Sequence, residues 1–380
     1  MNHHPDRMPG LDLLRAIAIV WVMLYHVSSY GPRLPAWVEF GWMGVDLFFV
    51  LSGFLIGWQV LKPRARGQSP HWSSFYVRRA LRVLPAYLAV VTLYFAVPGV
   101  RESAAIQPLW QFLTFTQNIF PDYFHARALS HAWSLCIEEH FYLVLPLVLW
   151  LMGKKPALGR VVAAAVITLA GGMALRAWIW EHDVAPFMHV TDGQGNFVNR
   201  YVENIYNPTY ARLDGLLAGF MLAVVRAFRP LWWQAITARG WWFGATGALG
   251  VYAAMCLPTP SYAGAVFVFP LLGASFAALL VACASGQTWI GRVRIPGAAP
   301  LAAMAFSLYL TNKMSYHLVR THLGASLPEA NLGRLAIYLA AALATGTLLY
   351  LAVERPGLRL RERFYRFAAA PNQRAPGFVK

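Results

Sequence analysis

Charged residues are scarce in this sequence of 380 residues. Asp, Glu, Lys and Arg make up 13% of it, and hydrophobic residues make up 58%. A soluble domain carries about a quarter charged residues. A chain with so little polar surface cannot cover a soluble globule of this length, so the composition argues against an ordinary soluble enzyme and favours an integral membrane protein.

Acidic residues and cysteines are also few. The 16 acids stand against 32 Lys and Arg, which leaves a formal net charge of +16. In a membrane protein the excess of positive charge on cytoplasmic loops explains this balance, so nucleic acid is not an expected partner. The three cysteines, Cys136, Cys256 and Cys283, lie inside apolar stretches. Their spacing predicts neither a disulfide framework nor a metal site.

Apolar stretches that could span a bilayer recur along the chain. A spanning helix needs about 20 mostly apolar residues. Candidate segments lie near residues 11–30, 40–61, 81–99, 132–152, 161–180, 208–225, 241–257, 263–284, 299–319 and 334–353. The stretch 107–120 is too short and too polar to span, and we expect an interfacial or re-entrant piece there. The sequence thus predicts an all-α, polytopic membrane protein with about ten transmembrane helices.

Loop charges predict the orientation of these helices. With the N-terminus in the cytoplasm, the loop after the second helix and the start of the third helix hold basic residues and no acid: Lys62, Arg64, Arg66, Arg78, Arg79 and Arg82. The polar segment 181–207 then lies outside and is mostly acidic. The positive-inside rule therefore places both termini in the cytoplasm. Residues 1–360 are predicted to form the membrane domain, and residues 361–380 a short basic cytoplasmic tail.

Several ionisable or amide side chains fall inside the predicted spans. A charge at the bilayer centre costs several kcal/mol, so such residues are functional candidates by default. They are Arg15, His26, Asp46, Glu138, Glu139, His140, Arg212, Asp214, Asn312, Lys313 and, at the end of the last span, Glu354. At about 1.5 Å per residue, His26 lies about 16 Å beyond Arg15 on nearly the same helix face. The predicted topology places most of these groups in one cluster in the outer half, with Arg15 and the loop arginines below it.

Structural roles compete with functional ones at each position. Arg15 could extend to the inner headgroups, and His26 could bond a backbone carbonyl in the core. Asp46 and Asp214 could simply pair with Arg212 or Lys313. Arg78, Arg79 and Arg82 could serve only to set the topology. Glu138 and Glu139 are adjacent in sequence, so we expect that they cannot both face one partner.

Six sequence blocks, taken together, resemble the membrane acyltransferase family 3, the polysaccharide O-acetyltransferase type. The first is the Arg15 to His26 spacing in helix one. The others are GVDLFFVLSGFLI (44–56), FYVRRALRVLPAY (75–87), WSLCIEEHFYLVLP (133–146), SLYLTNK (307–313) and VERP (353–356). The resemblance covers most of the chain. It departs from the family at Asn312, where relatives usually carry a histidine.

The resemblance implies an enzyme of a bacterial inner membrane that moves an acyl group, most often acetyl, from cytoplasmic acyl-CoA to a sugar hydroxyl of a surface glycan or lipid-linked precursor. His26 suits a general base, because histidine titrates near physiological pH. Glu138 could orient its imidazole. Arginines suit the phosphates of acetyl-CoA. The residues expected to bind that donor are Arg15, Arg78, Arg79 and Arg82, and those expected to bind the acceptor are Asp46, Glu139, Arg212, Asp214, Tyr309, Asn312 and Lys313.

Two other classes stay open from the sequence. A transporter of a glycan or small solute would also carry buried charges, although the inverted repeats typical of one are not visible. A catalytically inactive scaffold in glycan assembly is compatible with Asn312, because an amide cannot take up a proton near neutral pH. Association with itself or with other glycan-assembly proteins is left open as well.

Overall fold

The computed structural model describes residues 8–153, 157–190, 196–327 and 330–369, and these residues contain helices and turns but no strand. The predicted all-α class is therefore confirmed. The longer helices are α1 (Pro9–Ser28), α2 (Met43–Ala65), α3 (Trp72–Ala96), α5 (Trp133–Met152), α6 (Leu158–Ile179), α8 (Asp214–Phe228), α10 (Gly240–Cys256), α11 (Phe269–Ala284), α13 (Ala298–Leu323), α14 (Asn331–Leu349) and α15 (Arg355–Ala369). The shorter ones are α4 (Leu109–Leu113), α7 (Asn196–Tyr201), α9 (Pro230–Ala238) and α12 (Trp289–Arg292).

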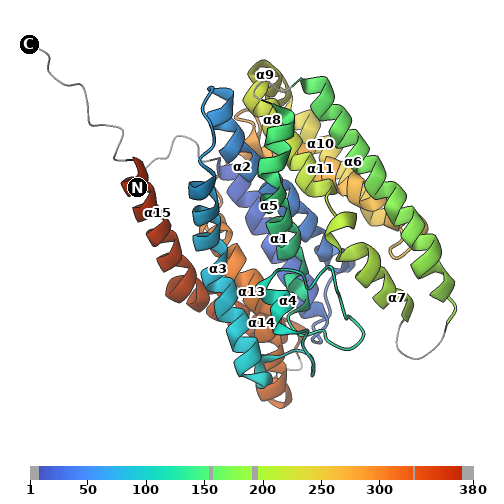
Figure 1. The fold of residues 1–380 in the computed structure, drawn as a ribbon. Coiled ribbons are helices and arrows are strands. Elements are labelled where there is room, and N and C mark those ends of the chain that lie inside the picture. The colour runs from blue at the N-terminus through green and yellow to red at the C-terminus, as the bar shows by residue number, and fades with distance from the viewer. Residues whose placement is uncertain (1–7, 154–156, 191–195, 328–329, 370–380) are drawn as a thin grey trace, which may run out of the picture.

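Each of the ten predicted spans coincides with a helix of the bundle in Figure 1. Among the described residues, however, 7 helices are long and apolar enough to cross a membrane, or 8 if α8 and α9, which bend by 116° at their junction, form one broken span. α10 is only 17 residues long, and α13 carries a run of polar residues on its buried face. The count of ten and the cytoplasmic side of both ends remain predictions.

The segments expected outside the bundle are short helical turns. α4, with 5 residues, is the non-spanning piece expected within 107–120. In the segment 181–207, a π-helical turn at Trp180–Val184 extends α6, and α7 follows it. Residues 191–195 of that segment lie outside the described residues. The predicted boundary at residue 360 falls within α15, and residues 370–380 of the predicted tail are also outside the described residues.

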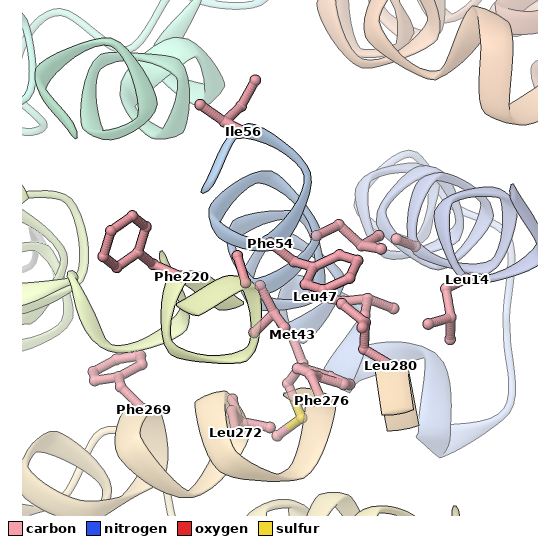
Figure 2. Close-up of a cluster of buried hydrophobic side chains, with 14 of the residues drawn as sticks. Leu14, Met43, Leu47, Phe54, Ile56, Phe220, Phe269, Leu272, Phe276 and Leu280 are labelled. Carbon is pink, nitrogen blue, oxygen red and sulfur yellow. The ribbon is translucent and has the colours of Figure 1, made fainter. Parts of the chain in front are cut away.

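The apolar core forms where α1, α2, α8 and α11 meet (Figure 2). Leu47 and Phe54 of α2 pack there with Phe220 of α8 and Phe276 of α11, and all four are at least 96% buried. α2 and α8 touch backbone to backbone, because a Cβ at Gly219 would stand 2.0 Å from the carbonyl oxygen of Val50. Small residues permit such close helix packing in membranes, where lipid supplies no hydrophobic drive between helices.

Large apolar side chains also cover the outside of the bundle. Trp150, Ile167, Leu249 and Leu348 are each at least 67% exposed. A soluble protein rarely leaves so much apolar surface uncovered. These outward faces fit contact with lipid tails, so the bundle directs its polar residues inward.

Candidate functional site

Buried polar side chains gather at three places in the bundle, and the single outer-half cluster expected from the sequence is therefore wrong. The ion-pair network comprises Asp46, Arg176, Arg212 and Asp214. The histidine centre comprises His26, Glu102, Ser130, His131, Asn312 and Lys313. The arginine cavity is lined by Arg15, Ser52, Arg79, Arg82, Ser134, Glu138, Tyr142, Tyr309 and apolar residues.

Both arginines of the ion-pair network are neutralised inside the protein. Arg212 donates to Asp46 at 2.8 Å and lies 3.8 Å over the ring of Phe269. Arg176 donates to both carboxylate oxygens of Asp214, at 2.9 and 3.0 Å. These contacts join α2, α6 and α8 with the turn before α8. The network therefore fits the structural alternative for Asp46, Arg212 and Asp214 rather than the predicted substrate binding, and Arg176 is a partner that sequence reasoning missed.

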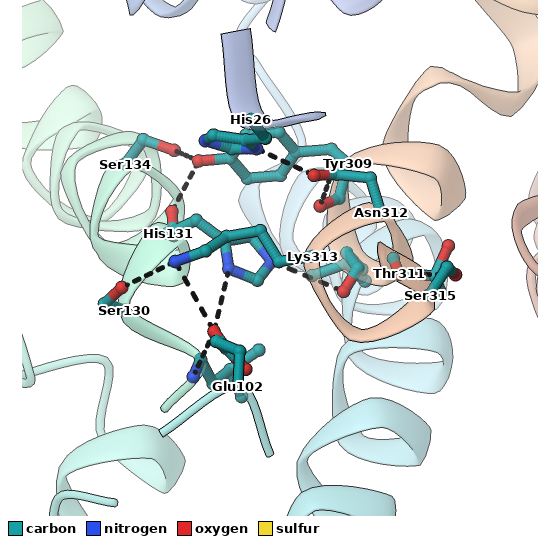
Figure 3. Close-up of polar contacts among 12 residues, drawn as sticks. His26, Glu102, Ser130, His131, Ser134, Tyr309, Thr311, Asn312, Lys313 and Ser315 are labelled. Atoms are coloured by element: carbon teal, nitrogen blue, oxygen red, sulfur yellow. Dashed lines mark hydrogen bonds and ion pairs between the residues drawn. The ribbon is translucent and has the colours of Figure 1, made fainter. Parts of the chain in front are cut away.

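His26 of α1 bonds to Asn312 of α13, as Figure 3 shows. His26 Nδ1 lies 2.7 Å from Asn312 Oδ1. The amide nitrogen of Asn312 donates to the carbonyl oxygens of Leu308 and Tyr309, at 3.0 and 2.8 Å. Only a donor fits between two carbonyl oxygens, so Oδ1 must be the atom that faces the imidazole.

This arrangement selects the tautomer of His26. An amide oxygen can only accept a hydrogen bond, so Nδ1 of the neutral imidazole carries the hydrogen. Within the described part of the chain, Nε2 has no hydrogen-bond partner. Its lone pair is available to take a proton, as a general base requires. The sequence suggested Glu138 as the group that orients the His26 imidazole, but in the structure Asn312 bonds to that ring. Asn312 is fully buried and is not one of the residues that line the cavity.

Three residues beside His26 were not singled out from the sequence. Glu102, in the loop after α3, accepts from the backbone of Leu129 at 3.0 Å and lies 3.4 Å from Lys313 Nζ. The ring of His131 lies 6.1 Å from that of His26. Lys313 also donates to Ser130 at 3.1 Å (Figure 3). Glu102 lies between predicted spans and His131 one residue before one, so a search of apolar segments could not find them.

The arginine cavity lies among α1, α2, α3, α5 and α13 and has a volume of about 120 Å³. Three arginines line it against one carboxylate, Glu138. Glu138 accepts from Ser52 at 2.8 Å and from Tyr142 at 2.9 Å. Nη2 of Arg79 lies 4.0 Å from both Glu138 and Glu139. The expectation that these adjacent acids cannot face one partner is therefore wrong, because the long arginine side chain reaches between them.

Arg15 and Arg82 differ from every arginine of the ion-pair network. Neither makes a hydrogen bond or ion pair with any residue in the described ranges, although both face the cavity. An uncompensated charge in the membrane interior is unfavourable. Guanidinium groups bind phosphate and carboxylate in fixed, bidentate geometry. The cavity is therefore suited to an anion that enters from outside the protein. Arg78, predicted to act with these arginines, is not one of the lining residues.

A pair of hydroxyl groups separates the cavity from the histidine centre. Ser134 and Tyr309 both line the cavity, and their oxygens lie 2.7 Å apart. Tyr309 also donates to the backbone carbonyl of His131, whose ring is 5.4 Å from the tyrosine ring. Figure 3 shows this contact beside His26. The cationic cavity and His26 thus lie on two sides of one hydrogen-bonded pair.

Known proteins share this chain's sequence pattern. A family model described as Acyltransferase domain matches residues 8–351. O-acetyltransferase OatA of Staphylococcus aureus is 30% identical over 237 residues, which are 59% of this chain and 35% of that protein. Peptidoglycan O-acetyltransferase OatA of Listeria monocytogenes shows the same identity and coverage. The chain thus spans about a third of the length of these relatives, and no solved structure matches it. Because the family model covers nearly the whole chain, the protein belongs to the acyltransferase family 3.

Proposed function

We propose that the protein transfers an acyl group, most simply acetyl, from acyl-CoA to a sugar hydroxyl of a surface glycan. The observation that carries this proposal is His26, with a free ring nitrogen, near a cavity lined by three arginines. Two of them, Arg15 and Arg82, make no hydrogen bond or ion pair among the described residues. The names of the relatives, both O-acetyltransferases, support transfer to oxygen. The word peptidoglycan in the name of the Listeria relative supports a glycan acceptor.

The chemistry needs one base and one anion site. The hydroxyl oxygen of the acceptor attacks the thioester carbonyl carbon, while Nε2 of His26 removes the hydroxyl proton. The carbon–oxygen bond forms, the carbon–sulfur bond breaks, and the proton on His26 passes to the leaving thiolate. The products are the acylated sugar and free coenzyme A. Asn312 keeps Nε2 as the basic nitrogen throughout, because its oxygen holds the hydrogen on Nδ1.

The donor and the acceptor approach from different sides in this proposal. The arginines of α3 follow the basic loop that is predicted to be cytoplasmic, whereas Glu102, Ser130 and Lys313 lie near the opposite end of the bundle. The phosphates of coenzyme A would bind Arg79, Arg82 and Arg15, and the thioester would extend toward Ser134 and Tyr309. Lys313 and Tyr309 would contact or shape the acceptor side. The enzyme would act in the bacterial inner membrane.

Purified protein in lipid nanodiscs tests this proposal. Acetyl-CoA and a glycan acceptor should yield acetylated glycan by mass spectrometry and free thiol in equal amounts. His26→Gln, which keeps a polar side chain of similar size, should yield neither. A transporter would move solute without releasing thiol, and an inactive scaffold would give no product with the wild-type protein. Either result would contradict the proposal.

A further inference from the structure

The last helix, α15, lies against the arginine-bearing part of α3, as Figure 1 shows. The two helices meet at Gly357, where a Cβ would stand 2.7 Å from the carbonyl oxygen of Leu81 and 3.3 Å from Pro85. Any larger residue would push the helices apart. The start of α15 therefore has a defined position beside α3 and is not a free basic tail.

This contact brings a further arginine to the donor side. Arg361 follows Gly357 by one helical turn and thus lies on nearly the same face of α15. It interacts electrostatically with Arg82, Arg79 and Arg78. Arg361 is partly buried, whereas Arg359 of the same helix is exposed. Only one of these two neighbouring arginines is therefore held among the cations of α3.

Four guanidinium groups from two helices repel one another at this place. The nearby acids are not bonded to these groups at close range. Glu362 of α15 is exposed, Glu138 and Glu139 approach Arg79 only at 4.0 Å, and the buried Glu354, which lies near Arg82, accepts a hydrogen bond from Ser307. Repulsion among the like charges opposes the packing of α15 on α3, and an anion of several charges between the two helices would relieve it. A chain of phosphate groups has that charge, and arginine recognises phosphate by paired hydrogen bonds.

The positions of the arginines relative to the cavity indicate which phosphate of coenzyme A each of them could bind. Arg15, Arg79 and Arg82 line the cavity that leads toward Ser134 and Tyr309, whereas Arg78 and Arg361 are not among its lining residues. A bound acyl-CoA must point its thioester toward His26, so the end farthest from the thioester stays outside the cavity. That end carries the phosphate on the ribose. The pyrophosphate is nearer to the thioester and would therefore bind Arg79 and Arg82.

We propose that Arg361 of α15 binds the ribose 3′-phosphate of the donor, which makes the last helix a part of the coenzyme A site. This inference rests on the proposed function, because it assumes acyl-CoA as the donor. It also assigns a role to α15 in donor selection. A carrier without this phosphate would not engage α15 but would still bind the arginines of α3.

Calorimetry on the full-length protein in phosphatidylcholine nanodiscs tests the assignment with two ligands, coenzyme A and 3′-dephospho-coenzyme A. Arg361→Gln should weaken coenzyme A binding about tenfold, the scale of one charge-assisted hydrogen bond, and should leave dephospho-coenzyme A binding unchanged. Arg359→Gln removes the same charge from an exposed position and should change neither affinity. Equal thermal unfolding midpoints in both variants would show that folding is intact.

The remaining outcomes separate the possible failures. If Arg361→Gln weakens both ligands equally or neither, while the wild-type protein binds coenzyme A, the assignment of Arg361 is wrong and the proposed function stands. If the wild-type protein binds no coenzyme A, both fail. If Arg361→Gln leaves coenzyme A binding unchanged but weakens binding to phosphatidylglycerol vesicles relative to Arg359→Gln, the arginine binds lipid headgroups and the inference is overturned.

Discussion

Two sets of arginines inside the bundle differ in their burial and in their partners. Arg176 and Arg212 are each 99% buried, and each bonds an aspartate within 3.0 Å. Arg15 and Arg82 line a cavity and bond to no residue in the described ranges. The arginines of the ion-pair network thus have a carboxylate partner within the protein, whereas Arg15 and Arg82 bond to none among the described residues. A buried charge is tolerated when it is paired, so the missing partner of Arg15 and Arg82 is best supplied by a ligand.

The largest effect is expected at the base that this cavity serves. His26→Ala and His26→Gln should each lower the rate of transfer by at least about 10²–10⁴-fold, the usual contribution of general-base catalysis. Coenzyme A affinity should change little, because His26 is not a lining residue of the cavity. Single-turnover rates and equilibrium binding measured on the same samples check both parts. Wild-type turnover in the Gln variant would remove His26 from this role.

The paired arginines should matter for stability. Arg212→Gln leaves Asp46 as a buried charge without its counter-ion, and breaking such a pair costs about 3–5 kcal/mol. Replacing both partners, as in Asp46→Leu with Arg212→Met, should recover most of that stability. Thermal unfolding in detergent measures both variants. If the single variant is as stable as the wild type, the ion-pair network is not structural and the comparison with the cavity arginines fails.

The cavity arginines should show the opposite pattern. Arg79→Ala with Arg82→Ala should weaken coenzyme A binding by about 1.5–3 kcal/mol for each charge-assisted hydrogen bond that the substitutions remove. Added salt should weaken binding by the wild-type protein and have less effect on the double variant, because fewer charged groups then hold the ligand. Calorimetry at two salt concentrations provides the measurement. Unchanged affinity would leave these arginines as topology signals only.

A smaller effect is expected at Asn312. Asn312→Ala leaves Nδ1 of His26 without its partner and should cost about 1–3 kcal/mol of catalysis. Asn312→His, which can still hydrogen-bond, should keep or raise activity. The pH–rate profile distinguishes these roles. A new ionisation that appears only in the His variant, with a rate increase of about 10²–10⁴-fold, would mean that the residue at 312 is itself the base.

Apolar segments made the helices predictable, and local spacing predicted that Arg15 and His26 share one helix face. A run of about 20 apolar residues can form little else in a membrane, so the ten predicted segments match helices. Arg15 and His26 share a face because three helical turns separate them. The residues that surround Arg15 and His26 cannot be predicted from spacing along one helix. His26 meets a residue 286 positions away, and Asp214 pairs with Arg176 from α6.

The remaining errors have the same physical cause. The predicted depth in the membrane places Asp46, Glu138 and Asn312 at one level, but rotation about each helix axis decides which neighbour a side chain meets. That rotation depends on packing contacts such as Gly219 against Val50, which no local pattern of charge reveals. The loop that carries Glu102 lies between predicted spans, so a search for charges within spans passes over it. Glu102 and His131, which lie outside the predicted spans, were therefore missed, and so was Arg176, although it lies within the predicted span 161–180.

Arg15→Gln tests the central claim most directly, because this arginine lies within α1 and makes no hydrogen bond or ion pair among the described residues on which a structural role could rest. Coenzyme A affinity and the thermal unfolding midpoint should be measured on the same preparation, with Arg212→Gln as its counterpart. The account predicts that Arg15→Gln weakens donor binding without lowering the midpoint, whereas Arg212→Gln lowers the midpoint. A lower midpoint with unchanged donor affinity in Arg15→Gln would contradict it.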